Sequence, residues 1–206
     1  LMRRYAGSER LLCTADAVQL RGRHNLANVL TAACCAMAAG ADLEAIRAAA
    51  MRFSGVPHRL EVVRTWRGVT YVNDSIATSP ERAVAALRSF SEPVILLAGG
   101  RDKPRPWEAG AEVTLETARA VVAFGEAAPL IAGVLREAMA QRRAEGAIAL
   151  HVEETLERAV ERAAALACPG DVVLLSPGGT SFDAFRDFEA RGERFRELVT
   201  SWSEGA

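Results

Sequence analysis

The segment PVILLAGG at residues 93–100 decides the fold, because it is a continuous apolar run that ends in two glycines. ARAVVAFG at 118–125 and DVVLLSPGG at 171–179 have the same form. Strands that are buried on both faces of a sheet show this pattern. Helical stretches alternate with these runs, so we expect an α/β fold with a mostly parallel sheet flanked by helices. Ligands of such folds bind at the carboxyl ends of the strands.

The segment SGVPHR at 54–59 breaks the helical pattern and predicts a domain boundary near Val56–Pro57. Residues 1–56 form a small first part, and 57–206 form a second part that contains the alternating region. The elements expected outside that region are possible strands near 10–13 and 17–20, helices at 24–40 and 42–53, a hairpin of strands at 60–66 and 69–75, and a final helix over 182–202.

Composition excludes several classes of protein. The chain has 206 residues, half of them hydrophobic and a quarter charged, as in folded globular proteins. Its formal net charge of -1 disfavours general binding to nucleic acids or membrane surfaces. No apolar run approaches the roughly 20 residues that span a bilayer, and the first ten residues do not resemble a secretory signal. We therefore expect a soluble protein without membrane insertion.

The four cysteines, Cys13, Cys34, Cys35 and Cys168, fit no zinc-binding or CxxC spacing. Cys34 and Cys35 lie in an alanine-rich helical stretch, where we expect small core residues. Free thiols of this kind indicate the reducing cytoplasm.

Three polar clusters could carry chemistry. The first is Asn25 and Asn28, three residues apart in the first turn of a helix. A carboxamide can pair with the edge of an adenine base. Asn25 could equally cap the helix, and the sequence leaves both interpretations open.

The second cluster joins Arg59, at the predicted domain boundary, to Asp74, at the end of a predicted strand. An arginine can hold a phosphate, and an aspartate can accept hydrogen bonds from ribose hydroxyls. An ordinary surface ion pair with an Asx turn is the alternative.

The third cluster joins Lys103, which follows Gly99-Gly100, to the segment from Ser176 to Ser181 at the end of another glycine-terminated strand. Lys103 is the single lysine beside 24 arginines. It either supplies a point charge that arginine cannot replace, or it survives by chance. With Ser181 it could bind a carboxylate, although turn glycines and a helix-capping serine explain the same residues.

Several common sites are absent from the sequence. It contains no GxSxG nucleophile elbow, no GxxxxGK[ST] phosphate loop, no GxGxxG and no metal-ligand spacing of histidines and carboxylates.

Six motifs in one order resemble the Mur ligases. They are GRHNLANVLTAA, FSGVPHRLEVV, YVNDSIATSPE, LLAGGRDK, VVLLSPGGTSFDAF and FEARGERF. The resemblance runs from about Arg21 to Val199 and is strongest to the members that add D-glutamate. It implies that residues 1–56 are the helical end of a central ATP-binding domain. It also implies that 57–206 are a Rossmann-like C-terminal domain that binds the amino acid.

The resemblance implies an ATP- and Mg²⁺-dependent ligase of peptidoglycan precursor synthesis. Such an enzyme phosphorylates UDP-N-acetylmuramoyl-L-alanine to an acyl phosphate, which the amine of D-glutamate then attacks. By position, the resemblance places Asn25 and Asn28 at the adenine, Arg59 near the phosphates and Asp74 at the ribose. The residues that it places around D-glutamate are Thr78, Lys103, Ser181, Phe182 and Phe188. A monomer is expected.

The chain departs from the family pattern in three respects. Ile76 stands where some members have a lysine, and the loop SPGGTS replaces the SPACAS of well-known members. The phosphate loop and the magnesium ligands of the family have no counterpart in these 206 residues. We therefore expect no catalytic residue in this chain and no ligase activity from it alone.

Two alternatives remain open at this stage. The chain could be a separate, non-catalytic module that binds an amino acid or a nucleotide. It could also belong to a related ligase that adds another amino acid, or to a folylpolyglutamate synthase. The motifs NDSIATSPE and SPGGTSFDAF favour the D-glutamate-adding ligase.

Overall fold

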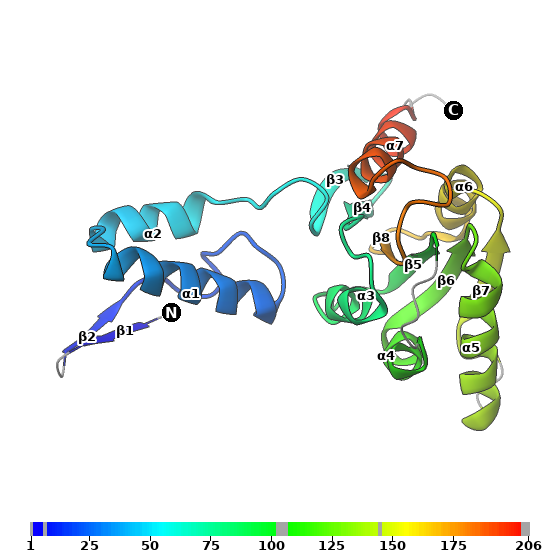
Figure 1. The fold of residues 1–206 in the computed structure, drawn as a ribbon, viewed down its shortest axis with the longest axis horizontal. Helices are drawn as coiled ribbons and strands as arrows, with labels where there is room; N and C mark the ends of the chain where they lie inside the picture. Colours follow the sequence, from blue (N-terminus) through cyan, green and yellow to red (C-terminus); the bar gives the residue numbers. More distant parts are fainter. Residues whose placement is uncertain (1, 6–7, 102–106, 144–145, 203–206) are drawn as a thin grey trace. The chain divides into compact units, whose positions relative to one another are not determined.

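The computed structural model describes residues 2–5, 8–101, 107–143 and 146–202. The chain forms two compact units, Leu1–Val56 and Pro57–Ala206, which appear with all their elements in Figure 1.

The smaller unit is a short hairpin followed by two helices. Helices α1 and α2 pack together, and the residues that precede α1 complete their core. Asp42 begins α2 by accepting hydrogen bonds from the backbone N–H groups of Glu44 and Ala45. The elements of this unit are β1 Met2–Tyr5, β2 Ser8–Leu11, α1 Arg23–Ala38 and α2 Leu43–Arg52.

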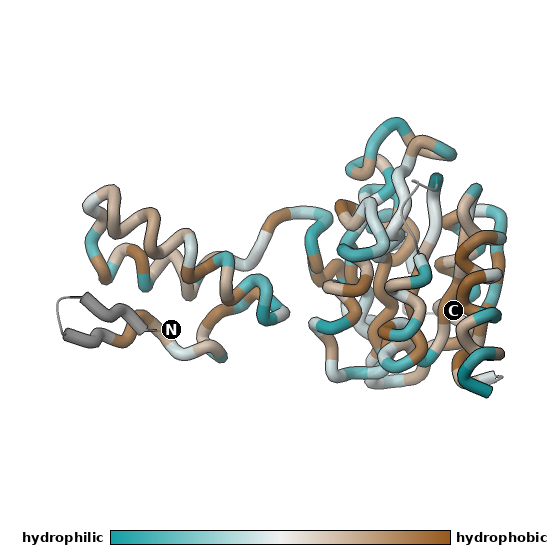
Figure 2. The backbone as a smooth tube through the Cα atoms, turned by 60° about the horizontal axis from the view of Figure 1, so that its bottom comes forward, coloured by the Kyte–Doolittle hydropathy of each residue, from teal (hydrophilic) through white to brown (hydrophobic). Residues whose placement is uncertain are grey.

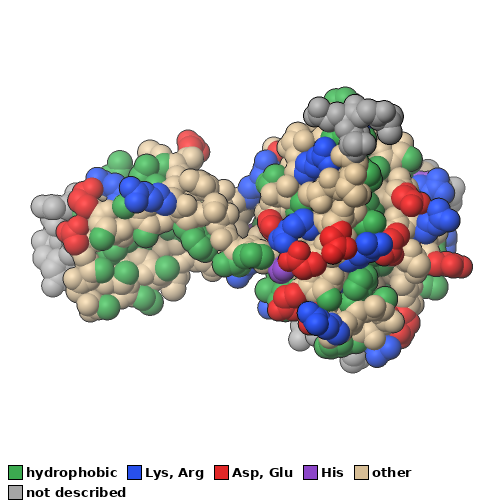
Figure 3. Space-filling model, turned by 90° about the horizontal axis from the view of Figure 1, so that it is seen from above, with side chains coloured by type: hydrophobic (Ala, Val, Ile, Leu, Met, Phe, Trp, Pro, Cys, Tyr) green, Lys and Arg blue, Asp and Glu red, His purple; other side chains and the backbone are tan. Residues whose placement is uncertain are grey.

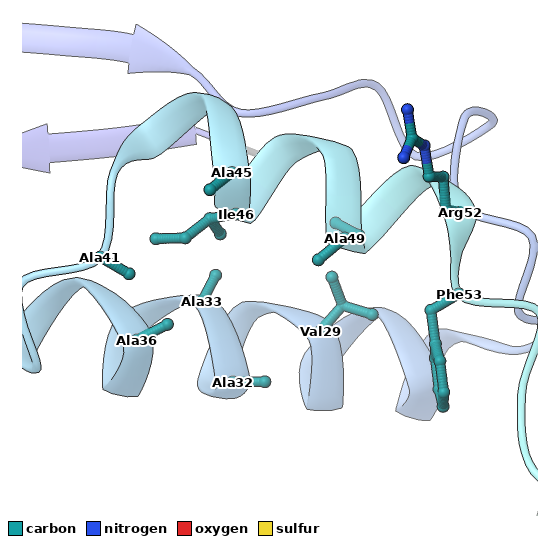
Figure 4. A pocket seen from close by; sticks show the side chains of 11 residues that line it. Val29, Ala32, Ala33, Ala36, Ala41, Ala45, Ile46, Ala49, Arg52 and Phe53 are labelled. Atoms are coloured by element: carbon teal, nitrogen blue, oxygen red, sulfur yellow. The ribbon is translucent and has the colours of Figure 1, made fainter.

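An apolar groove of about 620 Å³ lies between α1 and α2. Figure 4 shows that alanine side chains from both helices line most of it, with Val29 and Ile46 between them. Because alanine side chains are short, they leave space between the two helix backbones that larger residues would fill.

Two expectations for the smaller unit are wrong. Residues 17–20 form no strand, because Val18 packs into the core beside the helices instead of pairing in a sheet. Cys34 and Cys35 are exposed, since the buried stripe of α1 passes through Ala33 and leaves these two positions on other faces. Cys13 is the buried cysteine of the unit.

The larger unit is a six-stranded sheet in the order β3-β4-β8-β5-β6-β7. Only β3 and β4 pair antiparallel, as the predicted hairpin; the remaining pairs are parallel. The predicted α/β class with a mostly parallel sheet is therefore confirmed. Its elements are β3 Glu61–Trp66, β4 Val69–Asn73, α3 Pro80–Leu87, β5 Val94–Gly99, α4 Glu108–Thr117, β6 Ala118–Phe124, α5 Ala128–Gln141, β7 Ala149–Glu153, α6 Leu156–Leu166, β8 Val172–Gly178 and α7 Phe188–Thr200.

Two apolar clusters hold this unit together, one on each face of the sheet. Helices α3, α4 and α5 contribute to the first cluster, and α6 and α7 contribute to the second. All residues of β5 and β8 are buried, which explains their continuous apolar sequences. In Figure 2 the hydrophobic colour follows the strands of this unit, and many loops are hydrophilic.

Helix α7 is fixed at both ends. Asp187 caps its first turn by accepting a hydrogen bond from the Ala190 N–H. At the other end, Arg64 of β3 donates hydrogen bonds to the carbonyls of Val199, Thr200 and Trp202. These contacts set the position of the side chains that α7 contributes to the sheet edge.

The observed elements of the larger unit differ from the prediction in two places. The final helix begins at Phe188 and not at residue 182, because Asp187 stops the chain in an extended conformation and caps the helix there. Helix α4 was not expected. Its sequence EAGAEVTLET contains glycine and β-branched residues, which weaken the helical signal.

Within the described residues, no helix is long and apolar enough to cross a membrane. Figure 3 shows acidic and basic side chains mixed over the visible face of the larger unit. This mixture agrees with the net charge of -1.

Candidate ligand-binding edge of the sheet

The candidate site lies where β4, β5 and β8 end. We call residues 74–78, 100–101 and 179–181 the carboxyl edge. Hydrogen bonds join its segments: the Gly178 N–H donates to the Ala77 carbonyl at 2.8 Å. Arg101 and Thr180 exchange backbone hydrogen bonds of 2.8 and 2.9 Å. Three segments that are far apart in the sequence are therefore held side by side.

Asp74 is the buried carboxylate of this edge, with 5% of its surface exposed. Its Oδ1 accepts a hydrogen bond from the Leu60 N–H at 3.1 Å, and its Oδ2 accepts one from the Ser176 hydroxyl at 2.8 Å. Burial raises the pKa of Asp74 to about 7, although these hydrogen bonds and the charges of Arg59 and Arg82 oppose the rise. The carboxyl group therefore changes charge near neutral pH.

This raised pKa makes the stability of the larger unit depend on pH. Between the ordinary pKa of 3.8 and the folded value of about 7, the folded state holds a proton that the unfolded state releases. The contribution of Asp74 to stability is present below pH 4 and is lost as the pH rises through 7. We expect Asp74→Asn to remove this contribution, so the variant gains stability relative to the wild type between pH 5 and pH 8.

Urea unfolding at the two pH values measures this difference. Trp66, Trp107 and Trp202 are the three tryptophans of the chain, and all belong to the larger unit, so their fluorescence reports on that unit. If the free energy of unfolding changed with pH equally in the variant and the wild type, the assigned environment of Asp74 would be wrong.

Arg191 lies fully buried beneath the carboxyl edge. Its Nε donates to the Ser75 hydroxyl at 3.0 Å, and Nη2 donates to the Ser75 carbonyl at 2.9 Å. Nη1 and Nη2 each donate to the Gly179 carbonyl at 3.2 Å. Burial lowers the pKa of Arg191 to about 10 against the opposing charge of Asp183, so the group stays charged at neutral pH. Arg191 thus joins α7 to the segments that follow β4 and β8.

The Ser75 hydroxyl completes this junction by donating to the Phe188 carbonyl at 2.8 Å. Phe188 also packs edge-on against the His58 ring, with 6.1 Å between the ring centroids. The start of α7 is therefore tied to the segment that carries Asp74 and Thr78.

Arg59 projects from a tightly held turn. His58 and Leu60, on either side of it, both have positive φ angles of 63° and 47°, which is uncommon for residues other than glycine. The His58 ring is buried against the Asn73 amide, whose Nδ2 lies 3.0 Å from Nδ1 of His58. The turn holds the backbone of Arg59 in place while its side chain is exposed.

Asn25 and Asn28 lie together in the smaller unit, as their spacing predicts. Nδ2 of Asn28 donates to Oδ1 of Asn25 at 3.2 Å, and Nδ2 of Asn25 donates to the Arg21 carbonyl at 2.7 Å. The N-cap of α1 is Gly22, so the alternative that Asn25 caps the helix is wrong. Asn28 is exposed and can offer its amide to a ligand.

The residues expected around D-glutamate differ in exposure. Ser181 is buried, Thr78 and Phe188 are partly buried, and Phe182 is 61% exposed. The Ala77–Gly178 and Ser75–Phe188 hydrogen bonds bring their segments together. Lys103 lies outside the described residues; Arg101, two positions before it, is joined to Thr180, one position before Ser181.

A second hollow of about 420 Å³ adjoins the edge at the ends of β6 and β7. Its carboxylates are Glu126, Glu154, Glu157 and Asp183. Arg101 pairs with Glu126 and Arg194 pairs with Glu157, so two of the four acidic groups are neutralised by ion pairs.

The described residues fit a nucleotide better than they fit a magnesium ion. Asp74, with Arg59 and Arg82 nearby, offers acceptor and donor groups of the kind that a nucleotide needs. In the described part of the chain, no group of three histidine, cysteine or carboxylate residues could hold a metal ion. We therefore derive no step through Mg²⁺ from these residues.

Arg82 and Arg191 were not among the predicted site residues. Ser176 belonged to the loop that was predicted to lie near Lys103, but its hydrogen bond to Asp74 was not predicted. Ser176 interrupts the apolar run LLSPGG, and an isolated polar residue in a buried strand needs a partner, which here is Asp74. Arg191 stands in FEARGERF among several exposed charges, and nothing in that pattern marks it as buried.

The fold is a Rossmann-like domain, and the carboxyl edge lies where its parallel strands end, which is where folds of this kind bind ligands. The model of the Mur ligase glutamate ligase domain matches residues 58–179. The chain therefore belongs to the Mur ligase family, and the resemblance of its motifs is confirmed.

Two curated relatives show how much of a whole protein the chain covers. It is 44% identical over 202 residues to the UDP-N-acetylmuramoylalanine--D-glutamate ligase of Roseiflexus sp. (strain RS-1), with 98% of this chain and 42% of the relative aligned. It is 43% identical over 194 residues to the enzyme of that name from Acetivibrio thermocellus, with 94% of this chain and 41% of the relative aligned. The chain thus spans about two fifths of the length of these relatives.

Solved structures share the fold at lower identity. A UDP-N-acetylmuramate-alanine ligase from Thermotoga maritima aligns with a TM-score of 0.65 and 18% identity, covering 89% of this chain and 39% of that one. A folylpolyglutamate synthase from Mycobacterium tuberculosis aligns with a TM-score of 0.61 and 19% identity, covering 90% and 42%.

Proposed function

We propose that this chain supplies nucleotide- and amino-acid-binding residues of an ATP-dependent ligase that joins D-glutamate to UDP-N-acetylmuramoyl-L-alanine. The names of the relatives that align with nearly the whole chain support this activity. The reaction belongs to peptidoglycan precursor synthesis in the cytoplasm, with ATP and Mg²⁺ as cofactors. The smaller unit corresponds to the end of the ATP-binding domain, and the larger unit corresponds to the amino-acid-binding domain of a monomeric enzyme.

The observation that carries this proposal is the set of hydrogen bonds along the carboxyl edge. They gather the segments of Asp74, Thr78, Ser181 and Phe188, and they extend to Arg101. In the proposed enzyme, Asp74 accepts from the ribose and Arg59 holds the phosphates. Asn25 and Asn28, in the smaller unit, contact the adenine.

The amino-acid site needs a cation and several hydrogen-bond donors, because D-glutamate carries two carboxylates. In this proposal Lys103 supplies a point charge, and Thr78 and Ser181 supply hydroxyl groups. Phe182 and Phe188 give the site apolar walls. No residue of this chain is proposed to react covalently. ATP phosphorylates the carboxyl group of UDP-N-acetylmuramoyl-L-alanine, and the amine of D-glutamate displaces that phosphate.

Amide formation by the complete gene product tests this function. The product is incubated with ATP, Mg²⁺, UDP-N-acetylmuramoyl-L-alanine and one amino acid: D-glutamate, L-lysine or meso-diaminopimelate. We expect an amide by mass spectrometry with D-glutamate, and one phosphate released for each amide. Preference for another amino acid would assign the chain to a related ligase. Binding of nucleotide and amino acid without amide formation would assign it to a non-catalytic module.

A further inference from the structure

Ile76 carries no charge, and the side chain of a nearby arginine lies beside it. Arg82 lies in the first turn of α3, and its Nη1 donates to the Ile76 carbonyl at 3.1 Å. The guanidinium group therefore lies beside position 76, in the segment that carries both Asp74 and Thr78.

The charges of Arg82 and Arg59 both act on Asp74. Both side chains are exposed, and both lower the pKa of the Asp74 carboxyl by their charge. Among the described residues, neither guanidinium group has a carboxylate within ion-pair distance. By contrast, Arg101 and Arg196, near the same edge, are paired with glutamates. Within the described part of the chain, these two cations therefore lie near Asp74 without a salt bridge.

We infer that Arg82 binds an oxyanion of the ligand at the carboxyl edge. A guanidinium group carries five N–H donors, and the bond to the Ile76 carbonyl uses one of them. The remaining donors form a planar fork that matches two oxygens of a phosphate or a carboxylate. This inference rests on the proposed function, and its oxyanion is either a phosphate of ATP or a carboxylate of D-glutamate.

The first experiment compares Arg82→Met with the wild type in the complete gene product. Methionine keeps an unbranched side chain and removes the charge. We expect KM to rise about tenfold for one substrate, the size of one charge-assisted hydrogen bond. A rise for ATP identifies a phosphate, and a rise for D-glutamate identifies the carboxylate. Arg88→Met is the matched control, because Arg88 is also exposed and caps the far end of α3.

The second experiment asks whether the charge can be supplied from position 76. Adding Ile76→Lys to Arg82→Met should restore the same KM to within about threefold of the wild type, if the site requires only a cation there. Unchanged KM values in Arg82→Met, or equal effects of Arg82→Met and Arg88→Met, overturn the inference.

The inference can fail or hold separately from the proposed function. If the gene product forms no amide, its binding of ADP and of D-glutamate is measured by calorimetry, which needs no turnover. About tenfold weaker binding of one ligand to Arg82→Met, but not to Arg88→Met, supports the role of Arg82 without the ligase activity. Equal affinities in the wild type and Arg82→Met, or no binding of either ligand, overturn it.

Discussion

Replacing Arg191 by methionine is expected to lower the free energy of unfolding of the larger unit by about 3 kcal/mol. The wild-type guanidinium group satisfies the carbonyls of Ser75 and Gly179 in the interior. Methionine fills much of the same volume but leaves both carbonyls without a donor, at about 1–3 kcal/mol each, while the removal of a buried charge offsets part of this loss. Urea unfolding followed by tryptophan fluorescence gives the value.

The matched control for Arg191 is Arg194, one turn further along α7. Arg194 forms ion pairs with Glu157 and Glu197 at the surface. Exposed ion pairs contribute up to about 1 kcal/mol, so Arg194→Met should have a small effect. Similar losses in the two variants would show that Arg191 is not the internal junction described above. The loss of unfolding free energy in Arg191→Lys should lie between the losses in Arg191→Met and Arg194→Met, because one ammonium group cannot reach all the acceptors of a guanidinium group.

Replacing Gly100 by alanine is expected to destabilise the larger unit by about 2–4 kcal/mol and to disrupt the carboxyl edge. Gly100 has a φ of 94°, and a Cβ at this position would overlap the Thr180 carbonyl oxygen and lie 2.8 Å from Nη1 of Arg191. The overlapped oxygen accepts the hydrogen bond of the Arg101 N–H, so it cannot move without breaking the Arg101–Thr180 link. Unfolding free energy and ligand affinity should therefore fall together.

Gly133 provides the control for Gly100. It lies inside α5, and a Cβ there would meet no atom within 4 Å apart from its chain neighbours and the adjacent backbone of its own helix. Gly133→Ala should stabilise the protein by about 0.5–1 kcal/mol through the higher helix propensity of alanine. A loss of stability in Gly133→Ala, or none in Gly100→Ala, would contradict the described packing.

Much of the fold could be predicted because its signals are local. The runs 93–100 and 171–179 are apolar throughout, since both faces of β5 and β8 are covered by helices. Turn chemistry at Arg67-Gly68 identified the hairpin of β3 and β4. The unexpected elements had weak local signals: α4 contains poor helix formers, and α7 begins at a cap that a continuous helical pattern hides.

The candidate site could be predicted only in part, because its geometry is long-range. Asp74, Thr78 and Ser181 were identified from strand ends and motif resemblance. That Ser176 would meet Asp74, or that Arg191 would reach Ser75 across 116 positions, depends on strand order, which local patterns do not determine. The other arginines of α7 and the buried Arg191 stand in the same charged stretch of sequence. The sequence therefore does not indicate which of them is buried.

The most direct test of this account is the KM of the complete gene product for D-glutamate after Lys103→Met. The central claim is that the carboxyl edge binds the carboxylates of D-glutamate, and the Arg101–Thr180 link joins the segment before Lys103 to that of Ser181. The account predicts a rise of about tenfold or more in KM for D-glutamate, with KM for ATP changed less than about twofold. Unchanged KM for D-glutamate, or an equal rise for both substrates, would contradict it.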